Sequence, residues 1–220
     1  MEWPLLTPLP PAARDAVVQA ARRRTFARGE VVFHEGDPAD ALHLVVSGHL
    51  SVQVSTPQGD RATLNVLGPG SHVGELSLLP DARTQQRSAT VAALDPAETR
   101  VLSAAAFAQL RQAHPQIDQI LVTLLAERVR ELSERLLEVM YDGLDRRLYR
   151  CLYRLGRVYV DGSGPVTVPL TQDQLSDLVG GTRPTVNQIL QRLVEQRVVE
   201  LGRGRVVLLD AAALRRKAQL

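Results

Sequence analysis

The side chains with the most specific chemistry lie on the outward face of one predicted helix, residues 182–193. An arginine can reach O6 and N7 of guanine with two guanidinium nitrogens, and an asparagine or glutamine can pair similarly with N6 and N7 of adenine. Threonine and arginine near a helix start or in a hairpin can bind phosphates, which position a protein on DNA without reading its sequence. The candidates for base contacts are Arg183, Thr185, Asn187, Gln188 and Arg192, and the candidates for phosphate contacts are Thr182, Arg203 and Arg205.

Two short helices and a hairpin are predicted to hold these side chains. Thr171 and Gln174 form a capping box, in which each side chain satisfies an unpaired N–H at a helix start. A turn with two glycines follows at 180–181, and Thr182 is predicted to cap the second helix. Two helices joined by such a turn are typical of a helix-turn-helix, and residues 198–209 predict the hairpin of a wing. The predicted buried face of the second helix is Val186, Ile189, Leu190 and Leu193.

Charge is distributed unevenly along the chain. Residues 146–220 contain 13 Arg and Lys against 6 Asp and Glu, a net charge of +7. Residues 1–145 contain 13 basic against 18 acidic side chains, a net charge of −5. Each arginine taken alone is an ordinary surface charge, but the segregation indicates that the C-terminal third meets a polyanion.

Length and composition limit the remaining possibilities. The 220 residues can form two small domains, and 45% hydrophobic with 23% charged residues is typical of a soluble globular protein. No apolar run approaches the roughly 20 residues that span a bilayer, and the N-terminus lacks the pattern of a signal peptide. The single cysteine, Cys151, excludes a disulfide within the chain. We therefore expect a cytoplasmic protein with no membrane contact.

The N-terminal part is predicted to be an antiparallel β-roll after a short helix at 12–21. Strands of about five residues alternate with turns rich in Gly, Asp and Pro, a pattern typical of an all-β barrel or double-sheet roll. Together with the helices further along the chain, this predicts an α+β protein. The predicted strands are residues 31–33, 42–46, 50–54, 62–66, 90–93 and 99–102.

A long helix is predicted at 115–142, opened by Pro115. It carries a heptad seam, and its flanking positions are charged, as in a two-stranded coil; we therefore expect a homodimer through this helix. Burial of the seam within the same chain is the alternative. The seam consists of Leu125, Val129, Leu132, Leu136 and Val139.

A hinge is predicted at 142–146, between the long helix and the C-terminal part. Gly143 breaks the helix, and Asp145 is predicted to cap the next one at 146–158. Residues 158–160 and 166–168 flank a Gly- and Pro-rich turn and predict a small hairpin. The predicted domains are therefore 1–114 for the β-roll, 115–145 for the dimerisation helix and hinge, and 146–220 for the winged helix-turn-helix.

Several segments together resemble the CRP/FNR superfamily of bacterial transcription regulators. Residues 74–79, followed by Arg87-Ser88-Ala89, are similar to the phosphate-binding cassette of that family, and 182–186 are similar to the start of its recognition helix. The long helix and hinge lie in the expected order, and the resemblance covers essentially the whole chain. It implies a cyclic-nucleotide-controlled dimer that binds a palindromic operator on double-stranded DNA, with cyclic AMP as the first candidate effector and RNA polymerase as a candidate partner.

The resemblance also assigns a ligand site. A cyclic phosphodiester is an anion that arginine, serine and backbone amides can bind, and a carboxylate can accept from a ribose hydroxyl. By resemblance, Gly74 and Glu75 hold the ribose, and Arg87 and Ser88 hold the phosphate. A salt bridge between Glu75 and Arg87, with no ligand, is the alternative. The implied ligand residues are Gly74, Glu75, Leu76, Arg87, Ser88 and Ser133, with Arg83 and Thr84 as alternatives.

Three departures from the familiar cyclic-AMP receptors qualify this assignment. The loop between Glu75 and Arg87 is two residues longer, which makes Arg83 and Thr84 rivals for the phosphate. Leu132-Ser133 stands where those receptors have two polar residues that meet adenine, so half of the pair is present. Pro184 and Gln188 replace recognition-helix residues, so we expect a different operator.

Other functional classes find less support in the sequence. One cysteine is too few for an iron–sulfur sensor, the scattered histidines do not have cupin spacing, and no catalytic constellation or prosthetic-group site is present. We therefore expect a regulator that is not an enzyme and holds no metal. A constitutive DNA-binding dimer, whose β-roll is purely structural and binds no effector, remains the alternative function.

Overall fold

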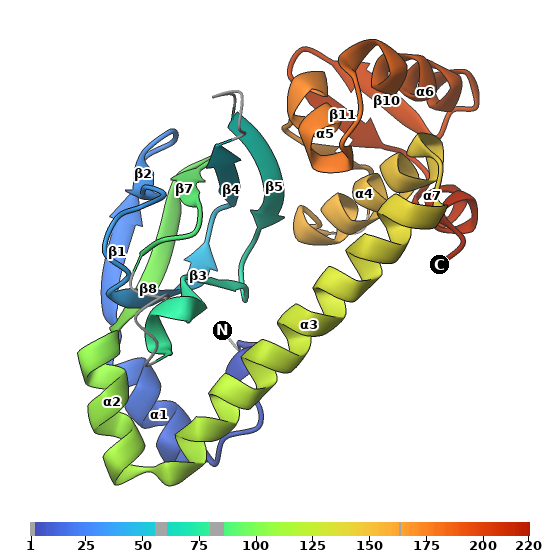
Figure 1. Ribbon diagram of the computed structural model, residues 1–220. Coiled ribbons are helices and arrows are strands. Elements are labelled where there is room, and N and C mark those ends of the chain that lie inside the picture. The colour runs from blue at the N-terminus through green and yellow to red at the C-terminus, as the bar shows by residue number, and fades with distance from the viewer. Residues whose placement is uncertain (1–2, 56–60, 80–85, 163) are drawn as a thin grey trace. The chain divides into compact units, whose positions relative to one another are not determined.

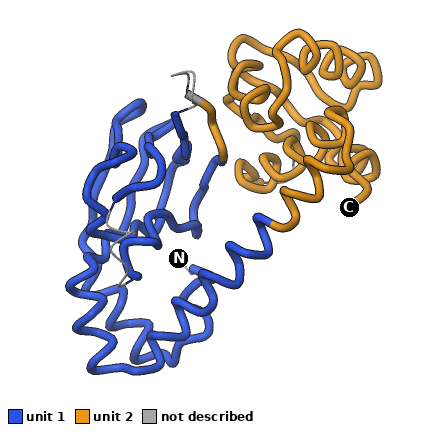
Figure 2. The backbone as a smooth tube through the Cα atoms, viewed as in Figure 1, with its two compact units in different colours: residues 1–61, 65–132 blue, residues 62–64, 133–220 orange. Residues whose placement is uncertain are grey.

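The computed structural model describes residues 3–55, 61–79, 86–162 and 164–220, and these fall into two compact units. Unit 1 comprises Met1–Arg61 and Asn65–Leu132, and unit 2 comprises Ala62–Leu64 and Ser133–Leu220 (Figure 2). Figure 1 shows unit 1 built around strands and unit 2 mostly around helices. The expected α+β fold with a β-sheet core, a long helix and a helix-turn-helix is confirmed.

The strands of unit 1 form two antiparallel sheets within the described residues. The first sheet, in spatial order, consists of β1 (Arg22–Phe26), β8 (Ala97–Ser103), β3 (Ala41–Ser47) and β6 (His72–Val73). The second consists of β2 (Val31–Phe33), β7 (Thr90–Ala93), β4 (Leu50–Ser55) and β5 (Arg61–Leu67). Interleaving of distant strands, such as β3 beside β8, brings together chain segments that are far apart in sequence (Figure 1).

The six predicted strands are all present, but β1 and β6 were not predicted. In β1 the first four residues are exposed and only Phe26 is buried, because β1 is an edge strand. Such a strand lacks the alternation of apolar and polar residues that identifies a half-buried strand in sequence. Strand β6 has two residues, too few for any periodicity.

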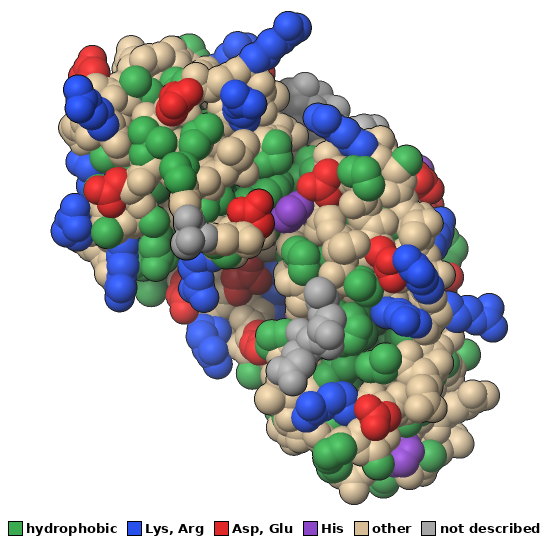
Figure 3. All heavy atoms as spheres, turned by 180° about the vertical axis from the view of Figure 1, so that it is seen from behind, with side chains coloured by type: hydrophobic (Ala, Val, Ile, Leu, Met, Phe, Trp, Pro, Cys, Tyr) green, Lys and Arg blue, Asp and Glu red, His purple; other side chains and the backbone are tan. Residues whose placement is uncertain are grey.

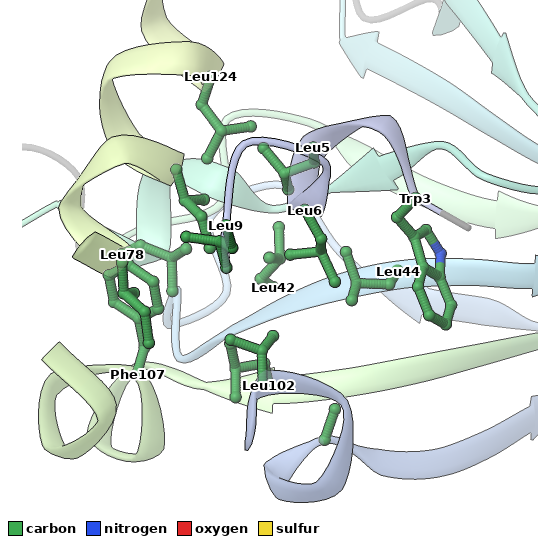
Figure 4. Close-up of a cluster of buried hydrophobic side chains, with 14 of the residues drawn as sticks. Trp3, Leu5, Leu6, Leu9, Leu42, Leu44, Leu78, Leu102, Phe107 and Leu124 are labelled. Carbon is green, nitrogen blue, oxygen red and sulfur yellow. The ribbon is translucent and has the colours of Figure 1, made fainter. Parts of the chain in front are cut away.

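One hydrophobic core joins the first sheet to the helices of unit 1. It lies between β3, β8 and three helices: α1 (Pro11–Ala20), α2 (Ala104–Ala113) and the start of α3 (Asp118–Tyr141). The N-terminal segment contributes Trp3, Leu5 and Leu6 to this core (Figure 4). The Trp3 indole also donates a hydrogen bond to the Val45 carbonyl at 3.0 Å. The segment before α1 is thus part of the fold. Helix α2 was not predicted.

Unit 2 contains α4 (Leu144–Val158), α5 (Gln172–Val179), α6 (Arg183–Glu195) and α7 (Ala211–Ala218), which pack around a small sheet. The sheet has the order β10 (Val199–Gly202), β11 (Arg205–Leu208) and β9 (Val166–Val168). The predicted hairpin of 158–160 with 166–168 is wrong, because Val158 ends α4 and β9 pairs with the distant β11. Val158, Tyr159 and Val160 have side chains that are common in strands, but this local preference did not determine their structure.

Helix α3 begins just after a 3₁₀ turn at Pro115–Ile117 and ends at Tyr141, close to the predicted bounds. Gly143 takes the N-cap position of α4. The prediction that Asp145 caps this helix is wrong, since Asp145 lies inside the first turn and no side chain caps the end. A carboxylate in the first turn still interacts favourably with the helix dipole.

Candidate functional site

The cassette of unit 1 begins with a left-handed turn that requires glycine. Gly74 has φ +85° and precedes the 3₁₀ helix Glu75–Leu78. A Cβ at Gly74 would lie 2.4 Å from Nη1 of Arg87 and 2.8 Å from the Ala41 carbonyl oxygen. The Ser77 hydroxyl and backbone N–H both donate to the Gly74 carbonyl, at 2.7 and 3.1 Å. Conformation and space therefore both demand glycine where Arg87 passes the turn.

Arg87 is buried and bound to the protein itself. Its Nη1 donates to the Ala41 carbonyl at 2.8 Å, and its Nη2 forms an ion pair with Asp40 at 3.0 Å. The guanidinium carbon lies 4.0 Å above the Phe33 ring, within the range of a cation–π contact. Its Nε is buried and makes no hydrogen bond within the described part of the chain. Arg87 is thus held rigidly before any ligand arrives.

The ion pair of Arg87 is made with Asp40, and Glu75 contributes a further negative charge nearby. Burial lowers the pKa of Arg87, and Asp40 is the strongest of the charges that oppose this shift, followed by Asp37 and Glu75. Burial also lowers the pKa of the adjacent His72, against the charge of Glu75. The cassette is therefore a partly buried cluster of charges rather than a single salt bridge between Glu75 and Arg87.

The other predicted ligand residues are distributed less compactly. Leu76 is half-buried beside Glu75, and Ser88 is exposed directly after Arg87. Arg83 and Thr84 lie outside the described residues. Ser133 is exposed on α3 and belongs to unit 2. The structure thus brings together Gly74, Glu75, Leu76 and Arg87, all in unit 1.

His43 was not predicted as a site residue, yet it lies beneath the cassette. It is buried on β3, its Nδ1 lies 3.2 Å from the Thr99 hydroxyl, and its ring centre lies 5.7 Å from that of Phe33. Burial lowers the pKa of His43 to about 4, and the positive charges of Arg87 and Arg24 act in the same direction. The imidazole is therefore neutral at pH 7. In the sequence, only the position of His43 inside an apolar strand indicates that its imidazole is buried and neutral.

In unit 2 the helix-turn-helix has the predicted local chemistry. The Thr171 hydroxyl accepts from the Gln174 N–H at 3.2 Å, and Gln174 Oε1 accepts from the Thr171 N–H at 2.9 Å, which completes the capping box. Helix α5 ends at Gly180, which is left-handed at φ +61°. The four predicted apolar residues of α6 are all buried. These contacts fix the two helices as one body.

The structure alters the role predicted for Thr182. It occupies the N-cap position of α6, but its side chain caps no backbone N–H. Its hydroxyl instead lies 2.9 Å from the hydroxyl of Thr185. Prediction of a cap from residue type failed here because the hydroxyl found a side-chain partner one turn further along.

The polar face of α6 is exposed, with one exception. Arg183, Thr185, Gln188 and Arg192 are exposed; Arg203 is exposed in the turn between β10 and β11, and Arg205 is exposed at the first position of β11. Asn187 is half-buried, and its Oδ1 accepts a hydrogen bond from Gln172 Nε2 at 3.2 Å. On the face seen in Figure 3, basic side chains of unit 2 are spread among uncharged and acidic ones. Four of the five side chains predicted to contact bases are therefore exposed on α6.

A row of ion pairs joins the end of α3 to α4, and it was not predicted. Glu138 and Asp142 face arginines spaced one helical turn apart on α4. Arg154 binds Glu138 with two nitrogens at 2.8 and 3.1 Å, and Arg150 binds Asp142 at 2.8 Å. Arg146 also binds Asp142, at 2.8 Å. The row, Glu138, Asp142, Arg146, Arg150 and Arg154, crosses the predicted hinge, and only its Asp142–Arg146 pair has the spacing of four that a sequence pattern indicates.

No group of three metal-binding side chains occurs among the described residues, and no helix found there is long and apolar enough for a bilayer. Burial raises the pKa of the Cys151 thiol to about 11, so the thiol stays protonated in the core.

Comparison with known proteins gives two family matches. A model of the cyclic nucleotide-binding domain matches residues 23–114, and a model of the Crp-like helix-turn-helix domain matches residues 146–217. Over 211 residues the chain is 33% identical to the cyclic AMP receptor protein of Thermus thermophilus, covering 96% of this chain and 94% of that protein.

Two further relatives extend this similarity. The CRP-like cAMP-activated global transcriptional regulator of Mycobacterium tuberculosis is 30% identical over 215 residues, covering 95% of this chain and 93% of that protein. The crystal structure of the Thermus thermophilus catabolite activator protein matches with a TM-score of 0.56 and 33% identity, over 98% of both chains.

Proposed function

The chain belongs to the CRP/FNR family of transcription regulators, which are not enzymes, and from this premise we propose that it is a homodimer whose binding to DNA is controlled by a cyclic nucleotide. The family gives the protein a cyclic nucleotide-binding domain and a DNA-binding helix-turn-helix. Cyclic AMP is the effector we propose, and the cytoplasm, where the chromosome lies, is the proposed place of action.

The exposed face of α6 supports sequence-specific binding. Arg183 and Gln188 carry the side-chain types that pair with guanine and adenine in the major groove, and both are exposed. Arg203 and Arg205 lie at the tip of the β10–β11 hairpin, where a wing can reach phosphates. We therefore assign base reading to Arg183 and Gln188, with Thr185 and Arg192 beside them. The hydrogen bond from Gln172 gives Asn187 a smaller part.

Exposure of the heptad seam on α3 supports a dimer. Leu125, Leu132, Leu136 and Val139 are between 45% and 63% exposed in the single chain. Large apolar side chains in a regular row on one helix are typical of a coiled-coil partner surface. A second copy of the chain would bury the row and place two recognition helices about 34 Å apart for a palindromic operator.

Two observations support cyclic AMP as the effector. Gly74, Glu75 and Arg87 lie together in a domain of the cyclic nucleotide-binding family, and two relatives at least 30% identical are named for cyclic AMP. A phosphate near the buried Arg87 would be attracted strongly, because little water is present there to screen the two charges from each other. RNA polymerase is the partner that a DNA-bound regulator of this family implies.

One observation favours the alternative of a constitutive DNA-binding dimer. Arg87 already has three partners within the protein, namely the Ala41 carbonyl, Asp40 and the Phe33 ring. An arginine so placed can stabilise the roll with no ligand at all. The difference between the two functions therefore depends on whether a nucleotide binds.

Titration calorimetry of the full chain with cyclic AMP, cyclic GMP and cyclic di-GMP tests the proposal. We expect heat and a finite affinity for cyclic AMP, and a tighter complex with DNA in its presence. No heat with any of the three, together with unchanged DNA affinity, would establish the constitutive alternative for these ligands. Sedimentation of the same sample should show a dimer, and a Leu132→Glu/Leu136→Glu double variant should show a monomer.

A further inference from the structure

The first turn of α5 carries an acidic side chain that contacts the recognition helix. Oδ2 of Asp173 lies 3.4 Å from Nη1 of Arg183, and both side chains are largely exposed, at 63% and 65%. Asp173 comes from the helix that precedes the recognition helix, yet it reaches the residue most suited to read guanine. A contact of this kind links the two helices at the point where a base would be bound.

We propose that Asp173 is a positioning residue that sets the base specificity of Arg183. The proposal rests on the proposed function, because it concerns how the same α6 surface reads DNA. The carboxylate lies beside Nη1 of the guanidinium and biases its orientation. Arginine has five N–H donors in a rigid fork, so those away from Asp173 remain available for O6 and N7 of guanine.

Asp173 also discriminates against the wrong target. An arginine on a protein surface can bind phosphate in addition to guanine, and phosphate contacts carry no sequence information. A carboxylate beside the guanidinium repels phosphate oxygens and leaves the neutral base edge as the better partner. Specificity that arises from repulsion of the competitor is a general device in binding surfaces.

The backbone under Asp173 is held firmly enough for this role. Asp173 is flanked by Thr171 and Gln174, whose capping box closes the first turn of α5. The neighbouring Gln172 makes a second link to the recognition helix, through Asn187 at 3.2 Å. The first turn of α5 therefore contacts the polar face of α6 at two points. Asp173 contacts the exposed Arg183, and Gln172 contacts the half-buried Asn187.

A purely structural role for Asp173 makes different predictions. An acidic residue in a first helical turn stabilises the helix through its dipole, and an exposed ion pair adds little to stability. If that were its whole role, removal of the charge would affect folding slightly and would leave the order of preference among DNA sequences unchanged. The preference profile is therefore the property to measure.

The experiment selects preferred duplexes from a random library with the full chain, in the presence of cyclic AMP. We expect the wild type to require guanine at one position of each half-site. Asp173→Asn should reduce discrimination at that position about tenfold while binding to unrelated duplexes stays equal or increases. Asp173→Glu, which keeps the carboxylate, should restore part of the preference. Asp177→Asn removes the same charge from the same helix and should leave the profile unchanged.

A second pair of variants isolates the contact with Arg183. In an Arg183→Ala background, Asp173→Asn should have no further effect on the profile. An effect that persists there, or an unchanged profile in Asp173→Asn alone, would overturn the proposal and leave the proposed function intact. If the wild type enriches no sequence from the library, the proposed function fails, and this proposal fails with it.

Discussion

Arg87 and Arg183 each pair with an aspartate, but their surroundings are opposite. Arg87 is 5% exposed, stacks on Phe33 and donates to a backbone carbonyl. Arg183 is 65% exposed and forms an ion pair with the carboxylate of Asp173. A ligand at Arg87 would join an arrangement that the fold has already completed, whereas DNA at Arg183 would meet a largely exposed side chain. The same residue type is therefore packed into the fold in unit 1 and largely exposed in unit 2.

The buried side of this comparison should give the greatest change in stability, through a dependence on pH. The folded pKa of His43 is about 4, below the unfolded value of 6.5, so the unfolded chain binds more protons between these values. The contribution of His43 is fully present above about pH 6.5 and is lost as the pH falls to about 4, with a total near 3 kcal/mol. Other groups titrate in the same range, so the difference from a His43→Gln variant is what isolates this effect.

Urea denaturation of both proteins at several pH values measures this difference. The wild type should lose about 3 kcal/mol more stability than His43→Gln between pH 7 and pH 4. Parallel curves would show that His43 is not buried as a neutral imidazole.

The second prediction separates the two arginines by stability. Arg87→Ala should lower the free energy of unfolding by about 2–3 kcal/mol, because it removes the packing on Phe33 and leaves the Ala41 carbonyl unpaired. Asp40 is 82% exposed and stays in water, so its loss of a partner adds little. Arg183→Ala should change stability by less than about 0.5 kcal/mol. Equal stability of the two variants would contradict the comparison.

The third prediction separates them by DNA binding. Arg183→Ala should weaken binding to the preferred duplex by about 1–3 kcal/mol and relax the preference at one base of each half-site. Binding titrations against the preferred duplex and single-base variants measure both effects. Equal weakening on every duplex would instead make Arg183 a phosphate contact.

The fourth prediction extends the comparison to buried acidic groups. Glu138 is largely buried and binds Arg154 with both oxygens, while Glu134, one turn earlier on α3, is exposed. Glu138→Gln should lower stability by about 1–2 kcal/mol, because the arginines lose a partner that water replaces only partly. Glu134→Gln is the matched control and should have almost no effect. Thermal unfolding of the two variants side by side decides the point.

The smallest expected effect is that of Asp40→Asn. Asp40 is exposed although its partner is buried, and surface members of ion pairs contribute about 0–1 kcal/mol. Its removal tests whether the Ala41 carbonyl and the Phe33 ring suffice to hold Arg87. A loss above about 2 kcal/mol in urea denaturation would show that the Asp40 carboxylate is the main anchor.

Local signals explain which parts of this molecule could be predicted from sequence. The capping box of Thr171 and Gln174, the glycine turn at 180–181 and the apolar face of α6 depend on neighbours within a few residues, and all are present as predicted. Strand β1 and the pairing of β9 with β11 depend on distant segments. The sequence therefore did not predict β1, and it predicted the wrong partner for β9.

The same distinction holds for the candidate sites. The residue types in the cassette were predicted through family resemblance, but the partners of Arg87 were not. Asp40 and Phe33 are 47 and 54 positions earlier in the chain, and only the folded roll brings them to Arg87. Of the ion pairs between Glu138 and Arg154, only Asp142 with Arg146 is a local i,i+4 pair that sequence could predict, whereas Glu138 and Arg154 pair across 16 positions through the packing of α3 against α4.

We propose that a nucleotide bound in unit 1 changes how the exposed face of α6 binds DNA. The most direct measurement is the fluorescence anisotropy of a labelled duplex, chosen from the library selection, titrated with the full chain at fixed salt. With saturating cyclic AMP we expect the affinity to rise at least about fivefold, the lower end of ordinary allosteric coupling. The same affinity with and without cyclic AMP, cyclic GMP and cyclic di-GMP would contradict the claim.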